Sequence, residues 1–348
     1  MFKRFAGALS ATMCATMLVS AAHAGDVTGA GSTFVEPIVK TWAEAYSSKT
    51  GDHINYQGIG SSGGITAIKG KTVDFAGTDK PLTAADQQAS GLYMFPVIIG
   101  GVVPIVNIPG VRPNQMRLTG PVLADIYEGK IRNWDDARIA HYNPGMHLPN
   151  MPITVVHRSD GSGTTFIFSS YLSKVSQSWK VRVGGNDSVN WPVGVGGKGN
   201  PGVSAVVKQT TGAIGYVEYW FAVQNHENST QMASHDRVFL YPKASNFAGA
   251  ASHANWTGTP GNAVMLLDEP GPTSWPISGA SFILVDKDIA DANKGATILK
   301  FFDWSFKNGG AMAAAKDYVP LPANVTAMIR KQWAAEVKSG GNSVYVAH

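Results

Sequence analysis

Residues 55–65, NYQGIGSSGGI, satisfy two motif templates at once. Gly58, Gly60 and Gly63 spell the G-x-G-x-x-G fingerprint of a dinucleotide-binding turn. The same letters also spell G-x-S-x-G, the nucleophile elbow of a hydrolase, with Ser62 at its centre. Both templates need a glycine turn between a strand and a helix. The stretch therefore predicts a glycine turn between a strand and a helix, but it does not by itself decide between the two functions.

A glycine turn of this kind presents free N–H groups and the positive end of a helix dipole, which together bind an anion. Two other stretches repeat the device: GAGSTFVEP at 29–37 and RSDGSGTTF at 158–166. In the first of them, Thr33 and Glu36 also fit an ordinary capping box, so that helix start has a purely structural interpretation as well. Three such starts after strands favour one shared anion site.

Charged residues near these turns narrow the choice of anion. Arg158 offers a rigid fork to an oxyanion and Asp160 can brace it, although an ordinary surface ion pair is the alternative. Asp79 follows a strand-like segment, where a plain turn or cap is the alternative. A carboxylate in an anion site can accept the proton of hydrogen phosphate and repels a fully ionised sulfate.

The two opening templates are weaker than the anion-site interpretation. In a dinucleotide-binding fold an acid that binds the ribose follows the glycine turn at a fixed spacing along the sequence, and Asp79 lies at about that spacing. However, the segment after Gly63 is too short and too glycine-rich for the crossover helix of such a fold. A triad needs a later acid and histidine, and His157 falls within a predicted strand. A secreted phosphatase or phosphoester hydrolase using Ser61 or Ser62 remains the alternative. Histidine spacing predicts no metal site.

The N-terminus predicts export. Lys3 and Arg4 precede an apolar stretch that ends at small residues, so residues 1–24 are predicted to be a signal peptide cleaved near Ala24. The only cysteine, Cys14, lies inside that segment, which leaves no disulfide or thiolate chemistry for the mature chain. Charged residues make up 15% of the chain, with no basic run, which argues against nucleic-acid binding.

Strand-like and helical segments alternate along the chain, which predicts an α/β architecture with mainly parallel strand pairing. The length of 348 residues favours two domains. Two apolar segments echo each other, FPVIIGGVVPIVN at 95–107 and WPISGASFILVDK at 275–287. They are candidates for two crossings between the domains.

Taken together, a series of blocks running in order from about residue 28 to 305 resembles the periplasmic phosphate-binding proteins of the ABC-type phosphate uptake system. The blocks are TGAGSTF, NYQGIGSSGG, VDFAGTDKPL, IGGVVPIVNIPG, DIYEGKIRNWDD, RSDGSGTTFIFSSYL, WPVGVGGKGNPGV, GAIGYVEY and LKFFDWSF.

The resemblance implies a class II periplasmic binding fold, a Venus-flytrap of two α/β lobes with two hinge crossings. We expect lobe I to comprise residues 25–99 and 275–348, and lobe II residues 100–274. A protein of this family is a periplasmic monomer that binds inorganic phosphate and passes it to a permease in the inner membrane. It catalyses nothing and needs no cofactor or metal.

The resemblance also implies the ligand set. Asp79 accepts the proton of the phosphate, Arg158 is the single cationic ligand, and Asp160 is the ion-pair partner of that arginine. Ser32 stands where the family usually has alanine. The implied phosphate ligands are Thr33, Phe34, Ser61, Asp79, Arg158, Ser162, Gly163 and Thr164.

Overall fold

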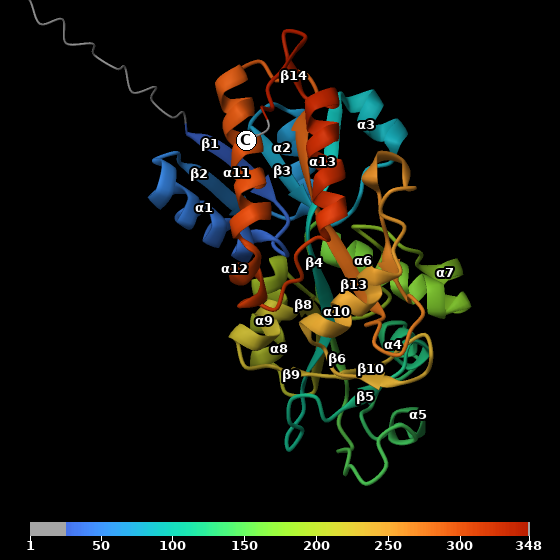
Figure 1. Cartoon of the computed structure of the whole chain (residues 1–348). Helices are drawn as coiled ribbons and strands as arrows, with labels where there is room; N and C mark the ends of the chain where they lie inside the picture. The colour runs from blue at the N-terminus through green and yellow to red at the C-terminus, as the bar shows by residue number, and fades with distance from the viewer. Residues whose placement is uncertain (1–25, 347–348) are drawn as a thin grey trace, which may run out of the picture.

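The computed structural model describes residues 26–346 and shows two α/β lobes that share a central sheet (Figure 1). The predicted signal peptide, residues 1–24, lies outside the described residues. No helix between residues 26 and 346 has both the length and the apolar character needed to cross a bilayer. The α/β prediction is confirmed.

Lobe I is the upper half of the molecule in Figure 1 and contains both ends of the described chain. Its first strands and helices alternate, and the chain returns to it at the C-terminal end. Its elements are β1 (Val27–Gly31), α1 (Glu36–Thr50), β2 (Ile54–Gly58), α2 (Ser61–Lys69), β3 (Phe75–Thr78), α3 (Ala84–Ser90), β13 (Ile277–Asp286), α11 (Ala292–Asn308), α12 (Gly310–Ala314), α13 (Ala323–Glu336), β14 (Lys338–Ser339) and β15 (Asn342–Ser343).

Lobe II is the lower half in Figure 1 and is built from the middle of the chain. Its elements are β5 (Arg117–Leu118), α4 (Gly120–Tyr127), α5 (Ala137–Ala140), β6 (Thr154–Arg158), α6 (Gly163–Val175), α7 (Gln177–Arg182), β7 (Val195–Gly197), α8 (Gly199–Gln209), β8 (Ala213–Glu218), α9 (Tyr219–Gln224), β9 (Asn228–Ser229), β10 (Gln231–Ala233), β11 (Phe239–Leu240), α10 (Ala244–Ser252) and β12 (Leu266–Leu267). The 3-10 turn η1 (Pro260–Asn262) instead packs against lobe I, where the Gln87 side chain of α3 donates to the Gly261 carbonyl at 2.8 Å.

The central sheet has the order β2-β1-β3-β13-β4-β8-β6-β7. Its outer strands pair in parallel, as expected for strands joined by helices. The prediction of mainly parallel pairing is wrong at the centre, where β13 pairs antiparallel with both β3 and β4, and β4 pairs antiparallel with β8. Strand β4 takes the chain from lobe I to lobe II and β13 brings it back, so these two neighbouring strands run in opposite directions.

Strand β4 (Leu92–Asn107) passes from one lobe to the other without a break, and 15 of its 16 residues are buried. It pairs with β13 as far as Gly101 and with β8 from Val102 onward. The side chain of Trp275, at the second crossing, donates to the Val102 carbonyl at 3.0 Å. The two echoing segments of the sequence are thus neighbouring strands at the junction of the lobes, while the exact lobe boundaries stay a prediction.

Candidate functional site

The first predicted helix start, after β1, is organised differently from a capping box. Helix α1 begins at Glu36 without a side-chain cap. The Glu36 carboxylate accepts instead from the backbone N–H of Gly58 at 3.1 Å, so the capping-box interpretation is wrong. The Phe34 N–H donates to the hydroxyl of Ser32 at 2.9 Å. The buried Thr33 hydroxyl accepts from the backbone and the side chain of Asn200, at 3.2 and 3.0 Å.

The second helix start is the NYQGIGSSGGI turn. Gly60 has φ 88°, a left-handed conformation that glycine adopts without strain, and Ser61 is the first residue of α2. As the first helical residue, Ser61 has an N–H that points out of the helix end. Its hydroxyl accepts from the backbone N–H of Asp79 at 3.3 Å. The turn therefore forms the predicted geometry and brings Ser61 beside Asp79.

Asp79 is 2% exposed and lies directly after β3. One carboxylate oxygen accepts from the Ser32 hydroxyl at 2.6 Å, and the other accepts from the hydroxyl of Ser281. Burial raises the pKa of Asp79 to about 6, although these hydroxyls, the nearby charge of Arg158 and the Ser61 hydroxyl pull the pKa down. Asp79 is thus an ionised acceptor above about pH 6.

Arg158 ends β6, and its side chain is only 1% exposed. Its Nε and Nη2 atoms donate to the two oxygens of Asp160 at 2.8 and 2.5 Å, and Nη1 reaches the Thr164 hydroxyl at 3.4 Å. Burial alone would raise the pKa of Asp160, but hydrogen bonds from Arg158 and the charge of Arg158 hold that pKa below its ordinary value. The predicted ion pair is therefore a two-pronged, largely buried fork.

The third helix start is α6. Ser162 is its N-cap and accepts from the backbone N–H of Thr165 at 3.1 Å. Gly163 and Thr164 follow as the first two helical residues, so their N–H groups point out of the helix end. A Cβ on Gly163 would lie 2.5 Å from oxygens of both Asp79 and Ser61. Only a glycine lets the second and third starts approach this closely.

All nine residues predicted from the sequence come together between the lobes. The two helix starts of lobe I and the one of lobe II face each other across the Asp79 carboxylate and the Arg158 guanidinium. Asn200, at the start of α8, joins the lobes because its side chain donates to the hydroxyls of Thr33 and Thr164. The assembled set is Thr33, Phe34, Ser61, Asp79, Arg158, Asp160, Ser162, Gly163 and Thr164.

Two residues of the site were missed by the sequence analysis. Ser281 lies on β13, 202 positions from Asp79, and no local motif marks it. Asn200 lies in the block WPVGVGGKGNPGV, where a glycine-rich turn before a helix was a usable signal. Both are fully buried, and each holds a side chain of the site by hydrogen bonds.

The geometry around Ser62 does not favour a hydrolase. Its hydroxyl donates to the Asp187 carboxylate at 2.7 Å, so a carboxylate rather than an imidazole is its partner. The His157 ring stacks on Trp191 at 4.8 Å and bonds to the backbone carbonyl of Arg158. Residues 26–346 also contain no cluster of three or more metal-ligating side chains.

Comparison with known proteins gives the family. A family model described as a PBP superfamily domain matches residues 19–308. Over 312 residues the chain is 48% identical to "Phosphate-binding protein PstS" of Xylella fastidiosa (strain 9a5c), covering 90% of this chain and 86% of that protein. This chain belongs to the PstS family. The PstS of Haemophilus influenzae is 46% identical over 317 residues, covering 91% of this chain and 95% of its own length.

Solved structures share the fold of this PstS family member at lower sequence identity. An ABC-type phosphate transport receptor from Vibrio cholerae matches with a TM-score of 0.56 and 22% identity, covering 85% of this chain and 100% of that one. A high-affinity periplasmic phosphate-binding protein matches with a TM-score of 0.71 and 20% identity, covering 91% and 97%. The two-lobe periplasmic binding fold is therefore confirmed.

The hydroxyl of Ser281 is expected to set the pKa of Asp79. Ser281→Ala removes a hydrogen bond that stabilises the ionised carboxylate, so the pKa of Asp79 should rise above about 6. A pH titration of the carboxyl carbon shifts by NMR, in phosphate-free buffer, measures it. Ser278→Ala is the matched control, because that hydroxyl on the same strand donates to the Trp275 carbonyl. An unchanged pKa in Ser281→Ala would contradict the account.

Proposed function

We propose that this protein binds inorganic phosphate, in the form of hydrogen phosphate, between its two lobes and delivers it to an ABC-type permease for import. The family supports the proposal, since the relatives at 46–48% identity carry the name phosphate-binding protein. The site supports it independently through the direction of its hydrogen bonds.

The direction of three hydroxyl groups carries the proposal. The hydroxyl oxygens of Thr33, Ser162 and Thr164 all accept hydrogen bonds from N–H groups of the protein. A hydroxyl has a single proton, and within residues 26–346 none of these three donates it to a protein acceptor. Each of the three therefore keeps its proton for a ligand that accepts hydrogen bonds.

Asp79 supplies the complementary function. Its two oxygens hold the hydroxyl protons of Ser32 and Ser281, and an ionised carboxylate retains further lone pairs. Hydrogen phosphate can donate its own proton to such an acceptor, whereas sulfate has no proton to give. Two facing acceptors in a buried site cost about 1–3 kcal/mol. This repulsion selects phosphate over sulfate.

Contacts between the lobes support a closed arrangement of the clamp. The Ser62 N–H donates to the Gly161 carbonyl at 3.2 Å, and its hydroxyl donates to Asp187. Lys80 adds an ion pair to the same Asp187 at 3.1 Å. These contacts form only when the lobes meet, so they favour a closed clamp around the ligand.

The protein is a binding protein and not an enzyme. The alternative of a phosphatase using Ser61 or Ser62 has no support from the family, whose members carry names for binding. Ser61 uses its oxygen as an acceptor for the Asp79 N–H, and Ser62 donates to Asp187. Neither serine has the histidine partner that activates a nucleophile.

The remaining parts of the proposal concern the protein in the cell. Export into the periplasm after cleavage near Ala24 places the clamp where it meets its permease. The mature protein acts as a monomer that touches the permease transiently. Its lobes comprise residues 25–99 with 275–348, and residues 100–274, so that closure is a rotation about the two central crossings.

Asp79→Asn tests the selectivity mechanism. The amide nitrogen can donate to a sulfate oxygen, so the ratio of sulfate to phosphate dissociation constants should fall at least tenfold, which corresponds to about 1.4 kcal/mol. Calorimetric titration with each anion at pH 8 measures the ratio. Asp187→Asn is the matched control, and its ratio should stay within about twofold of wild type. Sulfate excluded as strongly by Asp79→Asn as by the wild type would contradict the mechanism.

Arg158→Ala tests the cationic ligand. The change removes the guanidinium and leaves Asp160 without its partner, so phosphate binding should weaken by about thirtyfold or more, equivalent to roughly 2 kcal/mol. Arg112→Ala removes an exposed arginine of lobe II and should change the affinity less than twofold. Circular dichroism verifies that both variants fold. If both variants bind phosphate equally well, Arg158 is not a ligand.

A further inference from the structure

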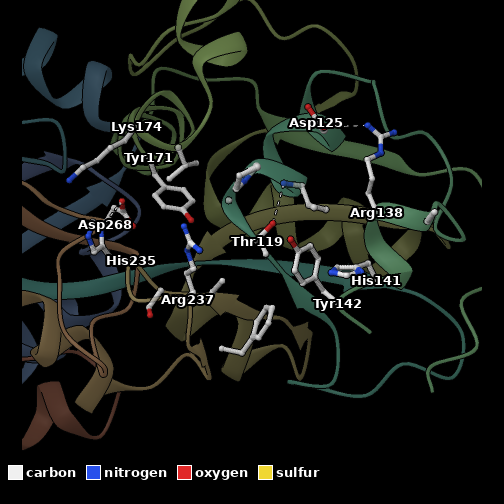
Figure 2. Close-up of a pocket in the computed structure, with 18 residues that line it drawn as sticks. Thr119, Asp125, Arg138, His141, Tyr142, Tyr171, Lys174, His235, Arg237 and Asp268 are labelled. Carbon is white, nitrogen blue, oxygen red and sulfur yellow. Dashed lines mark hydrogen bonds and ion pairs between the residues drawn. The ribbon is translucent and has the colours of Figure 1, made fainter. Parts of the chain in front are cut away.

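A cavity lies in lobe II, apart from the phosphate site. It has a volume of about 880 Å³, within the range of roughly 300–1,000 Å³ that is usual for small-molecule pockets. Its walls come from the start of α4, from α5, from the C-terminal half of α6 and from the β10–β11 hairpin (Figure 2). None of the nine residues of the phosphate site lines it.

Tyr171 places an unpartnered polar group in this cavity. The residue is 1% exposed, and among the described residues its hydroxyl has no hydrogen-bond partner. Burial raises its pKa, so the hydroxyl keeps its proton and can donate. A Cβ on Gly120 would lie 2.6 Å from the hydroxyl oxygen, so glycine at that position keeps the hydroxyl accessible. A buried tyrosine hydroxyl ordinarily has a partner.

Arg237 provides a cation opposite that hydroxyl. It lies in the turn between β10 and β11, at φ 62°, an uncommon conformation for a non-glycine residue. Figure 2 shows the Arg237 side chain and the Tyr171 ring directed toward one another. Within residues 26–346 the Arg237 guanidinium has no hydrogen-bond or ion-pair partner.

The other charged groups of the cavity are already engaged. Arg138 pairs with Asp125 at 3.2 Å, and the His235 ring lies 3.3 Å from Asp268. Lys174 donates to a backbone carbonyl rather than to a carboxylate. The two carboxylates of the cavity therefore have partners of their own, and Arg237 is the cation of the cavity that, within residues 26–346, has neither a hydrogen-bond nor an ion-pair partner.

The rest of the wall is largely apolar. It includes aliphatic side chains from α4 and α6 and two aromatic rings near the hairpin. Such a wall can pack against a ligand that has a flat or compact apolar group. A small inorganic anion has no such group, so it could contact only the Tyr171 hydroxyl and the Arg237 guanidinium. The residues concerned are Pro121, Val122, Tyr142, Val175 and Phe239.

We propose that this cavity is a second ligand site, which binds a small aromatic carboxylate. The carboxylate accepts from the Arg237 guanidinium and from the Tyr171 hydroxyl, and the ring lies on the apolar wall. A guanidinium fork matches the planar geometry of a carboxylate. The site is independent of the phosphate clamp, since it shares no ligand residue with it.

The test uses 2-naphthoate, with its neutral analogue 2-naphthamide as the matched probe. The protein is first saturated with phosphate, so that the clamp is occupied, and binding is measured by calorimetry and ligand-observed NMR. We expect saturable 2-naphthoate binding below millimolar concentration and at least tenfold weaker binding of 2-naphthamide. Arg237→Gln should weaken 2-naphthoate binding about tenfold and Tyr171→Phe several-fold.

Arg112→Gln is the control, because it removes an exposed arginine of lobe II outside the cavity. It should leave 2-naphthoate binding unchanged, and all three variants should retain phosphate binding. The proposal is overturned if 2-naphthoate shows no saturable binding up to about 5 mM, if 2-naphthamide binds equally well, or if Arg237→Gln behaves like Arg112→Gln. Displacement of 2-naphthoate by added phosphate also overturns it.

Discussion

The site depends on one constraint. An oxyanion that leaves water needs hydrogen-bond donors from the protein, and each of these donors must not already be bonded to an acceptor of the protein. Three hydroxyls, on Thr33, Ser162 and Thr164, meet this condition, because each accepts from a protein N–H group and donates to no acceptor within residues 26–346. Two others, on Ser32 and Ser281, donate to Asp79 and keep that carboxylate in place. The same kind of side chain thus performs two opposite roles, which are decided by its neighbours.

Charge alone does not explain recognition. One guanidinium, on Arg158, faces two carboxylates, on Asp79 and Asp160, so the ionisable side chains of the site carry a formal charge of −1. Attraction by net charge would also fail to separate phosphate from sulfate. In the proposed mechanism, neutral N–H and O–H donors carry the binding, and the single acceptor carries the selectivity. Glycines at 60 and 163 allow the starts to approach closely enough to act on one ligand.

The features that could be predicted from the sequence are those that a short local pattern encodes. A glycine–hydroxyl helix start is visible in a few consecutive residues, and the nine site residues predicted from such starts and from the family resemblance do assemble between the lobes. Contacts across long sequence separations have no local signal, so Ser281 and Asn200 were missed. The capping box failed because Gly58 from another strand competes for Glu36. The prediction of parallel pairing was wrong at β4 and β13. The direction in which neighbouring strands run depends on the path of the chain between the two lobes, and the pattern of apolar residues does not encode that path.

In the proposed mechanism, an ionised Asp79 receives the proton that hydrogen phosphate brings with it. At pH 8 hydrogen phosphate dominates in solution, and Asp79, with a pKa of about 6, is ionised. Calorimetric titration of the protein with phosphate, in two buffers of different ionisation enthalpy, counts the protons exchanged on binding. An ionised Asp79 predicts the same heat in both buffers, which means no net proton exchange. Uptake of about one proton per phosphate would show that Asp79 binds its own proton, and would contradict the proposed mechanism.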